Sequence, residues 1–105
     1  MAREQFQNLT EPMYYILMSL VMERCGVDIM EAVDEISNGR VRVGPGTLYA
    51  LLGKFEKEDM IRETEVQGRK RSYIITEKGQ EILRDEYRRL ITMVKDGVLY
   101  MEGKL

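Results

Sequence analysis

The segment from Val41 to Thr76 places the tightest limits on the fold, because a helical pattern is followed directly by two strand-like runs. Its apolar residues recur at positions i, i+3, i+4 and i+7, as Leu48, Leu51, Leu52 and Phe55. This spacing predicts a helix with one stripe that faces a core. Pro45 suits the first helical position, where its missing N–H costs nothing, so we expect a helix over residues 45–58.

The opposite face of this predicted helix is small, basic and hydroxylated. At about 100° per residue, it carries Ala50, Gly53, Lys54 and Lys57, with Thr47 and Tyr49 on its flanks. Such a face can approach a partner closely, donate hydrogen bonds and carry positive charge, which suits a nucleic-acid groove better than a small substrate. The glycines on either side of Pro45 have two interpretations, as a close approach to phosphate or as a sharp turn into the helix.

Two β-compatible runs follow, at residues 60–66 and 71–75, and residues 67–70 between them predict a hairpin. Arg69, Lys70 and Arg71 at its tip would repel one another unless an anion lies nearby, and a phosphate backbone is the natural candidate. Cations also occur on exposed edge strands because they discourage aggregation. We favour phosphate contact. Upstream, the alternation in Arg40–Val43 predicts a short strand that pairs with this hairpin.

Two helices are predicted before this segment, after residues 1–8, which are polar and expected to be only partly ordered. The first runs from a Thr10 cap to about Glu23, and Gly26 supplies the left-handed residue that ends it. The second begins at an Asp28 cap. Cys25, between them, is interpreted as a small buried hydrophobe rather than a reactive thiol. The order of elements predicts an α+β, mostly α, winged helix-turn-helix domain over residues 1–75.

Residues 76–105 predict a C-terminal helix capped by Thr76. Its apolar residues step by three or four positions, as Leu83, Tyr87, Leu90, Ile91, Val94, Val98, Met101 and Leu105. A chain of 105 residues has little left to cover this seam, so we expect the helix to pair with a second subunit as a dimerisation helix. Gly97 weakens a helix by about 1 kcal/mol relative to alanine. The sequence therefore leaves open whether the last two turns of this segment are helical.

Composition argues against several classes of function. There is no histidine and only one cysteine, and we see no nucleophile–base pair or phosphate loop, so neither an enzyme nor a cofactor is predicted. The longest apolar run is about half of what a membrane span needs, and no basic leader is visible, so we expect a cytoplasmic protein. The net charge of −2 is uneven, because residues 38–71 carry +3 and the remainder −5.

The residues and their order resemble the PadR family of transcriptional regulators, in its short form with a single C-terminal dimerisation helix. The resemblance rests on V-G-P-G-T-L-Y-A-L-L-G-K-F-E-K-E at 43–58, G-R-K-R-S-Y-I-I-T at 68–76 and T-E-K-G-Q-E-I-L at 76–83. Asp59 departs from the glycine that the family usually has there. Because aspartate tolerates the left-handed conformation, we expect the turn to survive.

The resemblance implies a homodimer that represses transcription by placing two winged helices in successive major grooves of a roughly palindromic double-stranded DNA operator. Carried over by position, Thr47 and Tyr49 would contact phosphate or bases, and residues 69–71 would hold the backbone. Lys54 is added from helical geometry alone. Tyr49 has an alternative role, which is to pack against the second helix as an amphipathic core residue.

Several short members of that family bind planar apolar compounds between their subunits and release DNA in response. The resemblance therefore implies a small apolar effector as a further partner. The candidate residues for such a cavity, or for the dimer interface itself, are Tyr14, Tyr15, Met18, Leu90, Met93, Val94 and Met101. Packing of the dimer core is the favoured interpretation of these residues. An alternative for the whole chain is a winged-helix module that binds another protein and not DNA.

Overall fold

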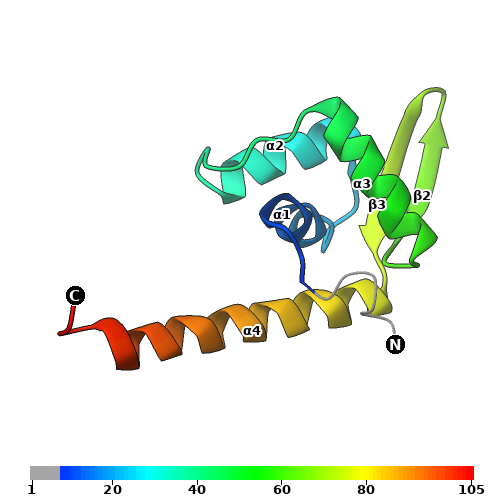
Figure 1. Cartoon of the computed structure of the whole chain (residues 1–105). Coiled ribbons are helices and arrows are strands. Elements are labelled where there is room, and N and C mark those ends of the chain that lie inside the picture. Colours follow the sequence, from blue (N-terminus) through cyan, green and yellow to red (C-terminus); the bar gives the residue numbers. More distant parts are fainter. Residues whose placement is uncertain (1–7) are drawn as a thin grey trace.

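The computed structural model describes residues 8–105, so the expectation about residues 1–8 falls almost wholly outside the described range. Within this range, three helices and a three-stranded antiparallel sheet of order β1-β3-β2 form the predicted winged helix-turn-helix, and a long fourth helix follows it (Figure 1). The elements are α1 (Glu11–Ser19), β1 (Arg24–Cys25), α2 (Gly26–Ile36), α3 (Pro45–Lys57), β2 (Ile61–Gln67), β3 (Lys70–Ile75) and α4 (Glu77–Met101).

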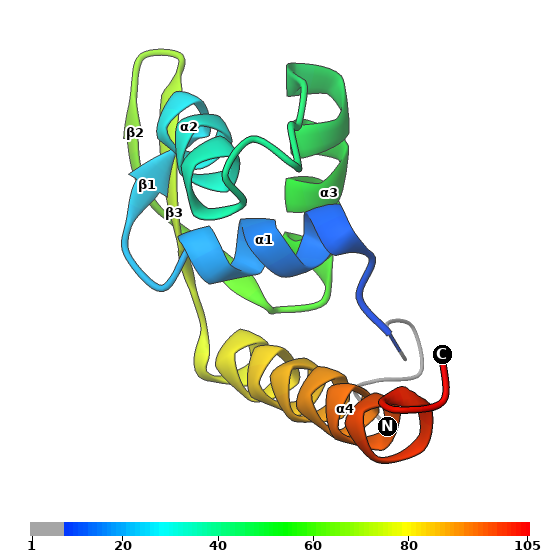
Figure 2. The ribbon, with the colours of Figure 1, turned by 90° about the vertical axis from the view of Figure 1, so that its left-hand side faces the viewer.

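The core lies around α1, which passes between the α2–α3 pair and α4 in both ribbon views (Figures 1 and 2). Ile16 and Leu17 of α1 are fully buried. They belong to the same core cluster as Leu48, Leu52 and Phe55 of α3. The apolar stripe predicted on residues 48–55 therefore faces inward, and its burial fixes the orientation of α3.

The end of α1 and the start of α2 differ from the prediction. Helix α1 stops at Ser19 instead of continuing to about Glu23, because the Leu20 carbonyl accepts the Ile75 N–H of β3 at 2.8 Å. The chain then turns so that Arg24 and Cys25 pair with β3 as an added strand. The left-handed role predicted for Gly26 is wrong, since this residue is the first of α2. Residue 25, and not Asp28, is the N-cap.

The predicted strand at Arg40–Val43 is also wrong, because this segment is an irregular connection between α2 and α3. Its alternation does describe burial, since both valines are buried and both arginines are exposed. The Ser37 hydroxyl accepts the Val41 N–H at 3.0 Å, so a side chain takes the place of one ladder bond. The third strand of the sheet is β1.

The remaining local signals have the predicted effect. Pro45 is the first residue of α3, and Asp59 adopts a φ of 58° in the turn after it. The Thr76 hydroxyl accepts the Gly79 N–H at 3.1 Å and caps α4. Gly79 then passes so close to the turn before β2 that a Cβ there would overlap the Met60 carbonyl oxygen, which ties the start of α4 to the domain.

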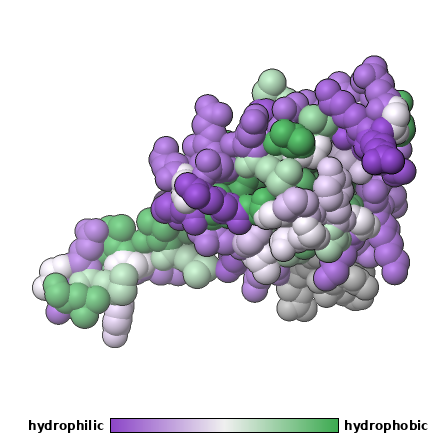
Figure 3. All heavy atoms as spheres, turned by 90° about the horizontal axis from the view of Figure 1, so that it is seen from above, coloured by the Kyte–Doolittle hydropathy of each residue, from purple (hydrophilic) through white to green (hydrophobic). Residues whose placement is uncertain are grey.

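Helix α4 continues through Gly97 and projects well beyond the rest of the molecule (Figure 1). The molecule, this helix included, measures 57 × 33 × 21 Å. The projecting end carries a band of hydrophobic side chains on the face seen in Figure 3. Val94 is 66% exposed and Val98 is 48% exposed. Across residues 8–105, each helix is too short or too polar to cross a membrane.

Candidate nucleic-acid interface

Helix α3 has two opposite faces. Leu48 and Phe55 are 0% exposed and form its inner face. The six residues expected on the outer face and its flanks are all exposed, namely Thr47, Tyr49, Ala50, Gly53, Lys54 and Lys57. The helix begins at Pro45 after a Gly44 cap that has no side chain to occupy its first-turn N–H groups. The positive end of the helix dipole is therefore open to an external acceptor.

The hairpin β2–β3 lies beside α3 and ends in a tight cationic turn (Figure 1). Gln67 pairs with Lys70, so the loop consists of Gly68 and Arg69, and Gly68 takes the positive φ of 61° that such a turn requires. The side chains of residues 69–71 are exposed. Arg71 forms an ion pair with Glu63 across the strands at 3.2 Å, which neutralises part of the positive charge.

A hollow of about 390 Å³ brings four of the predicted residues together, since it is lined by Tyr49, Arg69, Lys70 and Arg71. Its other lining residues, 25–27, are the end of β1 and the start of α2. A Cβ at Gly26 would overlap the Tyr49 hydroxyl. Tyr49 therefore packs against the first residue of α2 and still keeps 51% of its surface exposed. The predicted packing against the second helix is therefore present, and the exposed part of the side chain leaves the predicted DNA contact possible.

A second hollow, of about 320 Å³, lies between α3 and the hairpin. Its lining is Tyr49, Leu52, Gly53, Glu56, Arg69, Arg71 and Tyr73. Burial raises the pKa of the Tyr73 phenol, and the neighbouring carboxylates of Glu56 and Glu63 raise it further. The phenol therefore stays neutral at physiological pH. Among the described residues, Thr47 and Lys54 line neither hollow; they lie on the open surface of α3.

A model of the transcriptional regulator PadR-like family matches residues 14–85, which extend from α1 into α4. The chain belongs to this family. Membership of the PadR-like family implies regulation of transcription through DNA binding. Within residues 8–105, no group of three or more Cys, Asp or Glu side chains is arranged to hold a metal ion.

Two curated proteins are similar to this PadR-like chain. The Escherichia coli K12 transcriptional regulator YqjI is 25% identical over 73 residues, which are 70% of this chain and 35% of that protein. An uncharacterized 37.1 kDa protein in transposon TN4556 of Streptomyces fradiae is 36% identical over 61 residues, which are 58% of this chain and 17% of that protein. The chain thus spans about a third or less of these relatives.

The structure of RosR from H. salinarum resembles this PadR-like chain with a TM-score of 0.65 and 22% identity. The match covers 90% of this chain and 98% of that chain. At this level of identity the similarity concerns the fold alone. Because the match takes in nearly all of both chains, the similarity in fold reaches beyond the winged helix-turn-helix.

The residues predicted for a dimer or effector interface divide between two parts of this PadR-like fold. Tyr14 and Met18 of α1 line a largely apolar hollow of about 310 Å³ with Leu83, Arg84 and Tyr87 of α4. Leu90 lines a neighbouring hollow that also contains Tyr14 and Tyr15. Met93, Val94 and Met101 lie further along, on the exposed end of α4.

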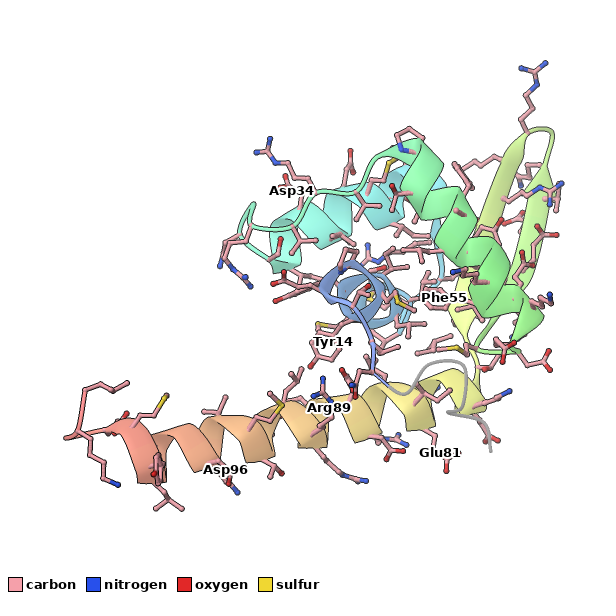
Figure 4. The ribbon with its side chains drawn as sticks, viewed as in Figure 1. Tyr14, Asp34, Phe55, Glu81, Arg89 and Asp96 are labelled. Carbon is pink, nitrogen blue, oxygen red and sulfur yellow. The ribbon has the colours of Figure 1, made fainter. Side chains whose placement is uncertain are left out.

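The two adjacent tyrosines of α1 have different surroundings. Tyr14 points from α1 toward α4 (Figure 4). Burial raises the pKa of its phenol, and Tyr15, Tyr87 and Glu86 raise it further. The Tyr15 hydroxyl instead accepts a hydrogen bond from the Arg40 guanidinium at 2.7 Å. Tyr14 therefore belongs to the α1–α4 contact, whereas Tyr15 also connects α1 to the segment before α3.

Glu86 is a structural residue that the sequence analysis did not identify. Its side chain is 1% exposed, accepts the Leu9 N–H at 3.2 Å and forms an ion pair with Arg89 at 2.6 Å. The side chain of Arg89 points from α4 toward α1 (Figure 4). Paired in this way, the buried carboxylate ties the chain just before α1 to the middle of α4. The only sequence signal was the i, i+3 spacing of Glu86 and Arg89.

Proposed function

We propose that this chain is a homodimeric repressor that binds a palindromic operator in double-stranded DNA through the helix near 45–58 and the wing near 66–71. One observation carries the proposal. The small, exposed and basic outer face of α3 lies beside the cationic turn of the hairpin, in a member of a DNA-binding regulator family. A helix fits the major groove, and a basic hairpin beside it can reach the adjacent phosphates.

In this proposal most of the predicted residues have a defined contact. Thr47, in the first turn of α3, and the Tyr49 hydroxyl donate hydrogen bonds to phosphate or base edges. Lys54 lies further along the outer face. Arg69, Lys70 and Arg71 neutralise phosphates and account for most of the salt dependence of binding. The hollow shared by Tyr49 and these three cations supports contact with a single DNA strand.

The dimer is proposed from the exposed apolar end of α4, with residues 76–105 as the dimerisation helix. Val94 and Val98 continue the seam of that helix but are not covered within residues 8–105. A second copy can cover them and hold two α3 helices at a fixed separation on DNA. The interface would then include Tyr14, Tyr15, Met18, Leu90, Met93, Val94 and Met101. A planar apolar effector that enters the hollow beside Tyr14 would alter that separation and release DNA.

The test is the salt dependence of binding to upstream DNA. Each phosphate contact contributes about 0.9 to the slope of log K against log salt concentration. We expect the triple variant R69A/K70A/R71A to bind more weakly and to lose roughly 2 to 3 from that slope. The control K78A/R88A/K95A removes the same number of cations from α4 and should leave the slope unchanged.

An unchanged slope in the wing variant would show that the wing assignment is wrong. Absence of sequence-selective DNA retention, together with a stoichiometric protein partner in a pull-down, would favour the protein-binding alternative. The same assay, repeated with planar apolar compounds, tests the effector. A compound that binds the wild-type dimer and leaves DNA affinity unchanged would contradict that part of the proposal.

A further inference from the structure

Gly53 lies in the interior of α3, where glycine is unfavourable because it lowers helix stability relative to alanine. Its backbone is helical, so no left-handed conformation requires glycine at this position. A Cβ built on Gly53 would meet no atom of residues 8–105 within 4 Å. The described part of the chain therefore has room for a side chain here and would be more stable with one.

Two other helical glycines show the contrast. A Cβ at Gly26 would overlap the Tyr49 hydroxyl, and one at Gly79 would overlap the Met60 carbonyl oxygen. Both are explained by contacts inside the chain. Gly53 is exposed, on the outer face of α3. A requirement for glycine at this position must come from a molecule that approaches α3 from outside.

The position of Gly53 indicates what that molecule is. Gly53 lines the hollow between α3 and the hairpin, together with Tyr49, Arg69 and Arg71. In the proposed function, the helix on one side of this hollow enters the major groove, and the hairpin on the other side binds the phosphates beside that groove. Those phosphates belong to one sugar–phosphate strand at the edge of the groove, so that strand must pass between helix and hairpin.

We propose that this strand makes its closest approach to the protein at Gly53, and that the missing side chain is what admits it. The inference rests on the proposed function and adds a positioning residue to it. Arg69 and Tyr49 border the same hollow and are placed to bind the phosphates of that strand. Glu56 also lines the hollow, and its carboxylate repels phosphate. The deoxyribose edge of the strand therefore passes over the neutral Gly53 side.

The experiment compares Gly53→Ala and Gly53→Leu with the wild-type protein on the same operator DNA. We expect G53A to raise the Tm by about 4 °C, because alanine favours the helix. We expect it to weaken DNA binding by about tenfold, because its methyl group occupies the space of the strand. G53L should bind still more weakly. The salt slope should stay at the wild-type value, since no charge is changed.

Gly97→Ala is the matched control, because Gly97 is also inside a helix and lies far along α4 from the hollow. A Cβ built on Gly97 would lie 3.2 Å from the flexible end of Met101, which can move aside. G97A should raise the Tm in the same way. Because Gly97 lies in the proposed dimerisation helix, its DNA affinity is compared at concentrations where both proteins are fully dimeric, and there it should equal that of the wild type. A stabilising substitution that weakens binding only at Gly53 would locate the strand there.

Three results would overturn parts of this account. Equal DNA affinity of G53A and wild type would refute the close approach at Gly53 and leave the proposed DNA binding intact. A lower Tm of G53A would refute the claim that the free chain has room for a side chain. Wild-type protein without salt-dependent DNA binding would refute the proposed function itself.

Discussion

Helices α3 and α4 carry the same type of apolar repeat, yet residues 8–105 cover that of α3 and leave much of that of α4 uncovered. The inner face of α3 is closed, with Leu48 and Phe55 at 0% exposure. The seam of α4 begins at Leu83, which packs against the core, and ends on the projecting segment, where Val94 and Val98 are exposed. Apolar spacing therefore predicts a helix and its inner face, but it does not say which molecule covers that face.

The outer faces of the two helices differ in charge. On α3, Lys54 and Lys57 accompany small residues, and the cationic turn of the hairpin is close by. On α4, cations alternate with acids, as in the Arg88–Asp85 ion pair at 3.8 Å. A mixed surface attracts neither sign of partner strongly, whereas the surface of α3 favours an anion. This contrast supports the proposal that nucleic acid binds α3 and a second subunit binds α4.

The largest expected effect comes from creating a cavity at the buried face of α3. Phe55→Ala should lower the free energy of unfolding by about 3–5 kcal/mol, because it leaves a cavity among fully buried side chains. Chemical denaturation should show this loss at every protein concentration. Val94→Ala should lower stability only at concentrations where the protein is a dimer. Equal losses for the two variants at all concentrations would contradict the contrast between the helices.

The next effect concerns the second subunit. The double variant V94E/V98E places two carboxylates on the seam, so we expect its dimer dissociation constant to rise by about a hundredfold or more. Sedimentation equilibrium measures this constant, and circular dichroism should show that the winged helix-turn-helix stays folded. T92E/L99E is the control, because helical geometry puts these residues on the opposite side of α4. If both variants dissociate equally, the seam is not the interface.

The elements predicted correctly are those whose signals are local. Pro45 starts α3, Gly68 permits the hairpin turn and Thr76 caps α4, and each acts within a few residues of its own position. The same local signals gave the outer face of α3 and the cations of the wing. Most of the fold, and the exposure of the outer face of α3 and of residues 69–71, could therefore be predicted from short stretches of sequence.

The errors involve contacts between distant parts of the chain. Arg24 and Cys25 form a strand only because they pair with Tyr73 and Ser72. A strand of two residues is too short to show a periodic pattern, whereas the alternation at residues 40–43 has the pattern of a strand without forming one. Gly26 was misassigned for the same reason. Its requirement for glycine comes from Tyr49, so the hollow at the start of α2 could not be predicted from either segment alone.

The smallest expected effect tests how the contact between Gly26 and Tyr49 positions the outer face of α3. Tyr49→Phe should weaken DNA binding by roughly fivefold, the value of about one hydrogen bond, with little change in stability. Gly26→Ala keeps the hydroxyl but displaces it, so it should weaken binding to a similar extent. The double variant should be no weaker than either single variant, since both remove the same contact.

Tyr87→Phe is the control for this cycle, because Tyr87 is similarly exposed but lies on α4. It should leave DNA affinity unchanged, which a titration by fluorescence anisotropy at fixed salt concentration would measure. If the effects of Gly26→Ala and Tyr49→Phe add instead, the glycine acts on DNA binding by a route other than the tyrosine. If Tyr87→Phe weakens binding as much as Tyr49→Phe, the hydroxyl on α3 has no special position, and the division of roles between the two helices fails at this residue.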